Sequence, residues 1–446
     1  MNLFSKLKKL DSESRHVKIG LIGAGKFATM YLAQIKKTPG IKLVAIADIQ
    51  PDIAKENLKR VDWSEEEFSC GSIEEAIKNN KTFITEDYRK LIDHDDIQII
   101  VEATGNPIVA VEHAIAAFES NKHVVMVTVE ADAFCGPLLA KKAHEKNVIY
   151  SLAYGDQPAL ICDLVDWART SGFKVTSAGR GHKWLPHFKY STPETVWGYY
   201  GLTDDVAKKG GLNPKMFNSF LDGSKPAIES VAVCNATGLH APKGGLTFPS
   251  GSIDDIPSLM KPKSSGGVLE SEGLVEVVSS MDQVTQKPIN YDIRYGVWVV
   301  FEGDIEYIKR CFHEYGVKTD DTGKYACLYK RWHLIGLEVG ISVASIATRH
   351  ESTGCPYVFN ADVSAVAKKN LTQGEVLDGE GGYTVVGSLV QAKDSISNKY
   401  LPLGLAHGWK LKRDINKDQF ITWNDVEFDS SNIAVKTRKE MEVTFS

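Results

Sequence analysis

The sequence predicts an α/β protein with three parts: a doubly wound parallel sheet over residues 1–160, an α+β domain over 161–360, and a small all-β domain over 361–446. Short apolar runs alternate with helical patterns up to residue 152, which is typical of βαβ units with right-handed crossovers. Near Gly172 this alternation stops, and Gly, Lys, Asp and aromatic residues become frequent. The last part shows short strands separated by turn signals.

Composition narrows the class of protein. The chain has 446 residues, 43% of them hydrophobic, and a net charge of -5 without clusters of Lys and Arg. These values argue against nucleic acid as a partner. No run approaches the ~20 apolar residues of a membrane span, so we expect a cytoplasmic protein with no membrane partner. The seven cysteines are dispersed, and no CxxC, HExxH or Cys/His cluster indicates a structural metal site.

A glycine turn follows the first predicted strand, residues 17–22. It reads Gly23-Ala24-Gly25-Lys26-Phe27-Ala28, a GxGxxA pattern, and a predicted helix over 26–37 follows it. The first glycine permits the tight bend and the second lets a pyrophosphate approach the backbone. The pattern predicts a Rossmann-type dinucleotide site that uses Gly23, Gly25, Lys26 and Phe27. A purely steric turn, or a copy that no longer binds, is the alternative.

Asp48 closes the second predicted strand, residues 43–47. It follows the glycines by about 20 residues, the separation at which a carboxylate accepts from the adenosine ribose hydroxyls. A carboxylate there favours NAD, because the 2′-phosphate of NADP would face a negative charge. Lys55 and Lys59 could offset this charge if they fold back.

The loops after later strands should meet at the same edge of the sheet. We predict further strands at 82–85, 97–101, 124–127 and 148–152, and helices at 51–60, 87–92, 108–119 and 137–144. Parallel sheets of this type bind ligands outside the carboxyl ends of their strands. We therefore expect Thr104, Gly105, Glu130 and Gly155 to line the cofactor, although turn chemistry alone could explain any one of them.

Polar residues recur every three or four positions in a predicted helix over 215–229, where they would share one face: Asn218, Asp222, Lys225 and Glu229. A solvated face is the ordinary explanation. However, the other side is apolar, and the stripe mixes amide, acid and amine as a binding face would. Lys183 and Lys189 add cations to this domain, which suits a phosphorylated or carboxylated substrate.

Two other segments are predicted to be structural. Residues 334–347 form an almost wholly apolar helix candidate, in which Glu338 is expected to be a satisfied structural acid. The final β domain contains no convincing acid and base pair. We therefore expect it to have an accessory or interface role.

With these residues in view, the whole chain resembles the homoserine-dehydrogenase-like oxidoreductases that carry a C-terminal SAF domain. Within that group it is most similar to the reductoisomerase-like enzymes, a second type of 1-deoxy-D-xylulose 5-phosphate reductoisomerase. The resemblance rests on residues 23–27, 151–160, 195–203, 216–223, 336–338 and 401–405.

The resemblance implies NADPH-dependent conversion of 1-deoxy-D-xylulose 5-phosphate into 2-C-methyl-D-erythritol 4-phosphate, an isoprenoid precursor. It also implies roles for the polar residues of the middle domain. Lys183, Lys189 and Lys225 would hold phosphate and transfer protons, with Asp222 and Glu229 as their partners. The resemblance prefers NADPH whereas Asp48 prefers NAD, so NADH stays open.

One departure bears on the substrate. Homoserine dehydrogenases have Asn-Lys after the fifth strand, and this chain has Glu130-Ala131 there, which argues against homoserine oxidation. Other phosphorylated or branched sugar derivatives stay open as substrates, as does a catalytically inactive dinucleotide sensor. Rearrangement of a hydroxyketone is often metal-assisted, so a divalent metal also stays open. A homodimer is expected.

Overall fold

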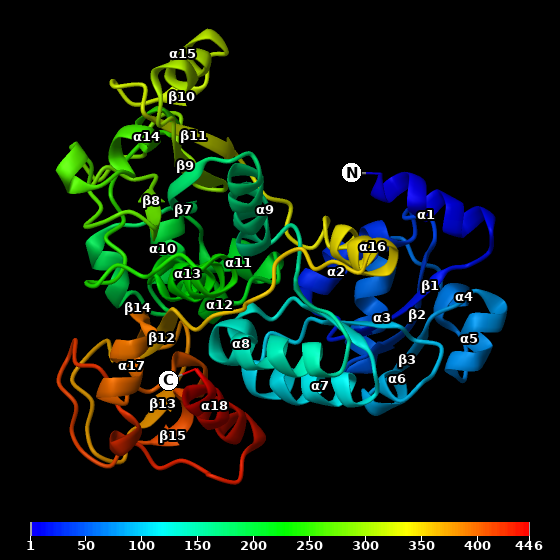
Figure 1. Cartoon of the computed structure of the whole chain (residues 1–446). Helices are drawn as coiled ribbons and strands as arrows, with labels where there is room; N and C mark the ends of the chain where they lie inside the picture. Colours follow the sequence, from blue (N-terminus) through cyan, green and yellow to red (C-terminus); the bar gives the residue numbers. More distant parts are fainter. Residues whose placement is uncertain (1, 446) are drawn as a thin grey trace. The chain divides into compact units, whose positions relative to one another are not determined.

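The computed structural model describes residues 2–445, which divide into two compact units (Figure 1). Unit 1 runs to residue 160 and also contains residues 334–357. Unit 2 contains residues 161–333 and continues from residue 358. Residues 334–357, which the sequence analysis assigned to the middle domain, thus pack with the N-terminal part.

Unit 1 is built on a six-stranded parallel sheet with the order β3-β2-β1-β4-β5-β6. Its strands are β1 (Val17–Ile22), β2 (Ile41–Ala47), β3 (Phe83–Thr85), β4 (Ile99–Glu102), β5 (His123–Met126) and β6 (Tyr150–Leu152). The direction of winding reverses between β1 and β4, so a ligand site is expected at the carboxyl ends of these two strands. The predicted doubly wound sheet is confirmed.

Helices cover this sheet, and α7 and α8 pack side by side (Figure 1). The helices of unit 1 are α1 (Leu3–Ser12), α2 (Lys26–Ile35), α3 (Pro51–Arg60), α4 (Glu65–Phe68), α5 (Ile73–Asn79), α6 (Arg89–Ile92), α7 (Pro107–Glu119), α8 (Val129–Glu145) and α16 (Gly340–Arg349). Two of the predicted helices in unit 1 have bounds that differ from prediction by more than two residues. Helix α8 begins eight residues before Pro137 and runs through it, at the cost of one backbone hydrogen bond. Helix α16 begins at Gly340, because the residues before it form a turn in which Leu337 N donates to Leu334 O.

Unit 2 contains a mixed five-stranded sheet with the order β10-β11-β9-β7-β8, in which only β7 and β8 are parallel. The strands are β7 (Lys174–His182), β8 (Leu274–Ser279), β9 (Val297–Glu302), β10 (Lys318–Thr319) and β11 (Tyr325–Lys330). Other elements are α9 (Gln157–Thr170), α10 (Val196–Tyr200), α11 (Asp204–Lys209), α12 (Pro214–Leu221), α13 (Ser224–Thr237), α14 (Ile256–Leu259) and α15 (Glu306–Glu314), with short turns η1 (Pro186–Tyr190), η2 (Ile253–Asp255) and η3 (Lys263–Ser265). Helix α13 packs against β7 and β8.

The predicted single helix over 215–229 is wrong, because the chain breaks between α12 and α13. Gly223 has φ +93°, a left-handed conformation that ends the first helix. Asp222 Oδ1 then accepts a hydrogen bond from Ser224 N at 2.8 Å, which starts the second helix. The four polar residues therefore do not share one helix face. Nor is the face solvated, since Asn218, Asp222 and Glu229 are all buried.

The C-terminal part of unit 2 is the small β domain that the sequence predicts. Two antiparallel pairs, β12 with β14 and β13 with β15, form its centre. Its elements are β12 (Ala361–Ala367), β13 (Val376–Asp378), β14 (Val385–Gln391), α17 (Ala392–Asn398), η4 (Leu403–Leu405), β15 (His407–Lys410), η5 (Trp423–Asp425) and α18 (Ile433–Thr444). Arg438 of α18 forms a buried ion pair with Asp362 of β12. Helix α13 of the middle part packs against β12 and β14.

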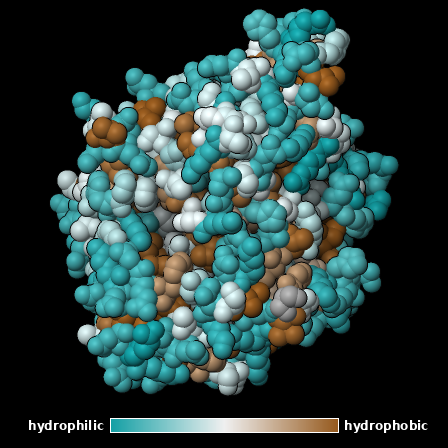
Figure 2. Space-filling view, turned by 60° about the vertical axis from the view of Figure 1, so that its left-hand side comes forward, coloured by the Kyte–Doolittle hydropathy of each residue, from teal (hydrophilic) through white to brown (hydrophobic). Residues whose placement is uncertain are grey.

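The molecular surface is mostly hydrophilic on the face shown in Figure 2, with hydrophobic residues in small groups. Among residues 2–445, no helix is both long and apolar enough to cross a membrane. None of the seven cysteines, all of which lie within residues 2–445, forms a disulfide bond.

Asp132, in the first turns of α8, is fully buried and accepts a hydrogen bond from Tyr150 OH at 2.9 Å. Burial raises the pKa of Asp132 to about 7, with the Tyr150 hydrogen bond acting in the opposite direction. The native state therefore holds a proton that the unfolded chain releases near pH 4. Stability from this proton is complete at low pH and is lost as the pH rises towards 7.

We predict that Asp132→Asn, which stays neutral at every pH, weakens the fall in unfolding temperature between pH 5 and pH 8. Calorimetric unfolding of the variant and the parent protein at both pH values measures this. The prediction is wrong if the unfolding temperatures of the two proteins differ by the same amount at pH 5 and at pH 8.

Candidate active site

The glycine turn after β1 has the geometry that a dinucleotide needs. Gly23 has φ +88°, and a Cβ at this position would lie 2.7 Å from the carbonyl carbon of Ala103. Side chains hold the turn on both sides. Ala24 N donates to Asp48 Oδ2 at 2.7 Å, and the buried Asn57 Nδ2 donates to Ala24 O at 2.8 Å. The turn is therefore fixed before any ligand binds.

Helix α2 begins at this turn with its N-terminus open. Gly25 is the N-cap, makes no side-chain cap, and has no atom within 4 Å of where a Cβ would stand. The first N–H groups of a helix have no intrahelical acceptor, so an open N-terminus suits a phosphate anion. The predicted Gly23, Gly25, Lys26 and Phe27 all lie at this turn. These residues fit a nicotinamide dinucleotide, which would supply the hydride.

Asp48 leaves β2 as predicted, and its second oxygen accepts from Gln50 N at 2.8 Å. The two lysines that could neutralise it have other partners. Lys55 Nζ lies 2.9 Å from Asp52 Oδ1, and Lys59 pairs with Glu65. The carboxylate of Asp48 thus keeps the local charge negative where a 2′-phosphate would lie.

A buried acid organises the loops after β4 and β5. Glu102 is fully buried, and its carboxylate accepts from Thr104 Oγ1 at 2.6 Å and from the hydroxyl of Thr128. Gly105 N donates to Thr128 Oγ1 at 2.9 Å, and His113 Nδ1 lies 3.2 Å from Glu102 Oε1. The predicted Thr104 and Gly105 are therefore ordered by Glu102, which the sequence analysis missed. An acid that ends an apolar strand was the available signal.

The other two predicted cofactor residues also follow strands. Glu130 lies in the first turn of α8, after β5. Gly155 lies after β6, where its Cβ position is 2.7 Å from Glu338 Cβ. Glu338 Oε2 accepts from Leu334 N at 3.0 Å, which agrees with the structural role expected for this acid.

In unit 2, positively charged side chains at and near the end of β7 lie close to the ring of Tyr200, the last residue of α10. Lys183 Nζ donates to Tyr199 O at 2.6 Å and lies 5.6 Å from the centre of the Tyr200 ring. The guanidinium of Arg294 lies 6.0 Å from the same ring. Burial, followed by the charge of Arg294, lowers the pKa of Lys183. Burial raises the pKa of Tyr200 to about 12. We call Arg180, Lys183 and Arg294 the cation cluster.

Arg180 also belongs to β7 and is buried against Glu229 of α13, with which it forms an ion pair. His182 lies two residues after Arg180 in β7. It donates from Nε2 to Phe220 O at 2.6 Å, and its Nδ1 lies 3.4 Å from Arg180 Nη2. Burial and then Arg180 hold the pKa of His182 well below its usual range. His182 is therefore neutral at pH 7. Glu229 is paired with an arginine, not with a lysine of the predicted set.

Asp222 is paired with a residue from the C-terminal β domain. Lys368 Nζ lies 2.6 Å from Asp222 Oδ2, and both side chains are almost wholly buried. Burial raises the pKa of Asp222, while Lys368 acts to lower it. The partner predicted for Asp222 from sequence, a lysine of the middle domain, is thus replaced by Lys368.

The remaining predicted lysines lie differently. Lys189, in the turn η1, is partly exposed and pairs with Asp418 at 2.6 Å. Lys225 lies half-buried in the first turn of α13. Of the five residues predicted to be catalytic, only Lys183 belongs to the cation cluster. The sequence analysis missed Arg180, His182, Tyr200, Arg294 and Lys368, although Arg180-Gly-His-Lys183 at the end of an alternating strand was a usable signal.

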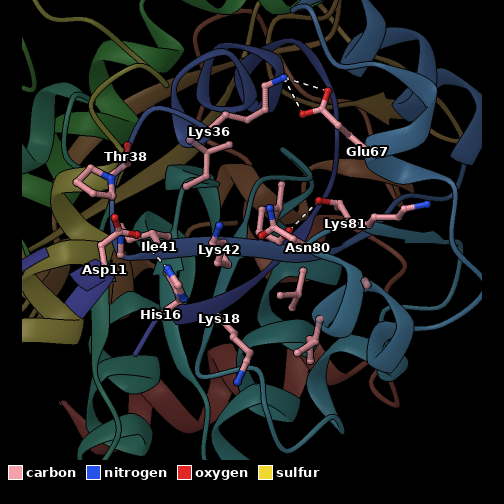
Figure 3. Close-up of a pocket in the computed structure, with 18 of the residues that line it drawn as sticks. Asp11, His16, Lys18, Lys36, Thr38, Ile41, Lys42, Glu67, Asn80 and Lys81 are labelled. Carbon is pink, nitrogen blue, oxygen red and sulfur yellow. Dashed lines mark hydrogen bonds and ion pairs between the residues drawn. The ribbon is translucent and has the colours of Figure 1, made fainter. Parts of the chain in front are cut away.

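A separate pocket of about 930 Å³ lies at the opposite, amino-terminal edge of the sheet in unit 1 (Figure 3). It is lined by five lysines, of which two have an acidic partner. Lys36 Nζ lies 2.9 Å from Glu67 Oε1, an ion pair drawn as a dashed line in Figure 3. Lys18 Nζ lies 2.7 Å from Asp96 Oδ1. The pocket is not part of the dinucleotide site. Within residues 2–445, no group of three or more His, Cys, Asp or Glu side chains could hold a metal ion.

Family models match three consecutive parts of the chain. Residues 17–127 match an oxidoreductase family with an NAD-binding Rossmann fold, of the GFO/IDH/MocA type. Residues 155–339 match the catalytic domain of "Oxidoreductase DRL", and residues 362–427 match the SAF domain. Two of the three parts of the chain are thus similar to parts of NAD-binding and other oxidoreductases. No curated protein matches this chain.

Solved structures resemble the chain only distantly. KijD10, a 3-ketoreductase from Actinomadura kijaniata in complex with NADP and TDP-benzene, is 18% identical, with a TM-score of 0.27 over 38% of this chain and 48% of that one. A putative oxidoreductase from Klebsiella pneumoniae is 20% identical, with a TM-score of 0.25 over 38% and 43%. YvaA from Bacillus subtilis is 10% identical, with a TM-score of 0.38 over 75% and 89%. The chain spans about half the length of the first of these structures.

We predict that Asp48→Asn raises the ratio of kcat/KM for NADPH to kcat/KM for NADH by about tenfold, because about 1.4 kcal/mol of repulsion between a carboxylate and the 2′-phosphate is removed. Initial rates with both cofactors measure it. Glu56→Gln, at an exposed position of helix α3, is the control and should leave the ratio unchanged. An unchanged ratio in Asp48→Asn would show that Asp48 does not face the ribose.

Proposed function

We propose that the protein is a reductoisomerase that converts 1-deoxy-D-xylulose 5-phosphate into 2-C-methyl-D-erythritol 4-phosphate with a nicotinamide cofactor. The cation cluster of unit 2 carries this proposal. Lys183 and Arg294 place two positive charges beside one tyrosine ring, in a partly buried setting where a phosphorylated substrate would gain most from them. The open N-terminus of α2 in unit 1 would hold the cofactor.

The proposed reaction has two steps. A hydroxyl of the substrate loses a proton while the carbon skeleton rearranges to an aldehyde, and the aldehyde then takes a hydride from the cofactor and a proton. The net change is substrate plus NADPH plus a proton to product plus NADP⁺. Positive charge stabilises the oxyanion that forms in each step.

Lys183 has the properties of the group that transfers the proton. A lysine can act as an acid or a base near neutral pH only when its pKa is lowered. Burial and Arg294 lower the pKa of Lys183. The carbonyl of Tyr199, which accepts from Lys183 Nζ, fixes the position of the amine.

NADPH is the proposed cofactor on the strength of the family resemblance, while Asp48 and the paired Lys55 and Lys59 favour NADH. Both are therefore assayed. The proposal also leaves a divalent metal open and includes a homodimeric state and a cytoplasmic location. Assays with added Mg²⁺ or with EDTA test the metal requirement. Light scattering of the purified protein tests the homodimer.

The decisive experiment follows the absorbance of the reduced cofactor with 1-deoxy-D-xylulose 5-phosphate, and beside it with homoserine and several phosphorylated ketoses. NMR of the product separates two functions that share the cation cluster. A rearranged branched tetritol phosphate supports the reductoisomerase. An unrearranged alcohol would instead establish a dehydrogenase of another phosphorylated sugar. Turnover of homoserine alone would contradict both.

We predict that Lys183→Met lowers kcat by about 10² or more, the range usual for acid and base groups. Arg294→Met should move the alkaline limb of the pH profile of kcat to higher pH. The reason is that loss of a neighbouring positive charge raises the pKa of Lys183, which then stays protonated to higher pH. Initial-rate measurements of kcat across pH 6 to 10 test both effects.

The exposed Lys263→Met serves as the control for these two variants and should keep the parent rate and profile. A drop of less than about tenfold in Lys183→Met, against the 10² to 10⁴ usual for such groups, would remove Lys183 from the mechanism.

A further inference from the structure

We propose that Lys368, a residue of the C-terminal β domain, is a positioning residue for the cation cluster. Its ammonium fixes the corner between α12 and α13, and this corner in turn holds His182 and Arg180 in place. The inference rests on the proposed function, because it gives the β domain a part in substrate binding. Sequence analysis expected only an accessory or interface role for that domain.

Lys368 contacts two residues of the middle part of unit 2 and one residue of its own domain. Besides the ion pair with Asp222, Lys368 Nζ donates to Ser191 O and to Gly382 O, each at 2.9 Å. Lys368 directly follows β12, and its side chain is 3% exposed. A buried ammonium that donates to two carbonyl oxygens and also forms an ion pair is held in one position.

The corner that Lys368 contacts is built from side-chain bonds. Asp222 uses one oxygen for Lys368 and the other for Ser224 N, at the start of α13. Asn218 Nδ2 bridges Ser191 O at 3.0 Å and Gly381 O at 2.9 Å, so a second link joins α12 to the β domain. The direction in which α13 leaves α12 thus depends on residues of the β domain.

Both helices of the corner make contacts with residues of β7. Phe220, two residues before Asp222, accepts the Nε2 hydrogen bond of His182 at 2.6 Å. Glu229, in α13, forms the ion pair with Arg180. A rotation of the corner would therefore displace both residues of β7. Lys183, the next residue after His182, would move with them.

Removal of Lys368 would leave Asp222 as a buried carboxylate without a cation. Such a group costs several kcal/mol if it stays charged, so it takes up a proton or moves towards water. Either response disturbs the corner. The dinucleotide turn in unit 1 shares no bond with Lys368, so cofactor binding provides an internal reference.

The test compares Lys368→Met with the parent protein in steady-state assays. We expect KM for 1-deoxy-D-xylulose 5-phosphate to rise at least tenfold while KM for the cofactor stays within twofold. Lys368→Arg keeps the charge and should recover most of the loss. Unchanged KM values for both substrates in Lys368→Met would overturn the proposal.

Arg438→Met is the matched control for lost stability. Arg438 is another buried cation of the β domain, and its ion-pair partners Asp362 and Glu442 lie in the same domain. Its loss should lower the unfolding temperature at least as much as Lys368→Met does, without a selective rise in KM for the sugar phosphate. If both variants change the KM values alike, Lys368 acts only through stability and the proposal fails.

Two further measurements keep the test decisive. If Lys368→Met does not fold, the double variant Asp222→Asn with Lys368→Met, which buries no unpaired charge, replaces it and should show the same selective rise in KM. Binding of inorganic phosphate, measured by calorimetry with saturating cofactor present, needs no turnover. A parent protein that binds no phosphate and turns over no sugar phosphate refutes the proposed function. Equal phosphate affinity in the parent and the variant refutes the role of Lys368 alone.

Discussion

The packing of unit 2 depends on the neutralisation of two buried acids. One lies at the corner between α12 and α13, and the other lies further along α13. Asp222 and Glu229 lie in an interior where an unpaired carboxylate would be costly. One is neutralised by Lys368 from the β domain and the other by Arg180 from the central sheet. Breaking either pair would leave a buried charge, so the β domain, the corner and the sheet are held in register with one another.

This constraint explains how cations can accumulate at the end of β7. Arg180 is neutralised, so its charge does not repel its neighbours fully, and His182 is kept neutral by burial and by Arg180. Lys183 and Arg294 then supply the positive charge beside Tyr200. Their mutual repulsion is the reason that an anionic substrate would be favoured there.

In unit 1, acidic side chains are also satisfied by specific partners, but these partners form hydrogen bonds in place of ion pairs. Asp48 and Glu102, each at the end of a parallel strand, accept from backbone and hydroxyl groups of the turns around them. These turns are thereby fixed at the edge of the sheet where the winding reverses, which is where such sheets bind ligands.

Local signals in the sequence by themselves determined much of this protein. The doubly wound sheet, the glycine turn and Asp48 could be predicted because strand period, glycine placement and a terminal acid are properties of short segments. The small β domain could be predicted from its turn residues in the same way.

Only the tertiary structure decided which charges meet. Asp222 pairs with a lysine that lies far along the chain, and Arg294 reaches Tyr200 from a distant loop. Sequence spacing even misled at residues 215–229, because Gly223 breaks the helix there, and the polar residues predicted to share one helix face make buried contacts from two helices. Charge pairing over such distances depends on burial and on chain packing, and neither has a local signature.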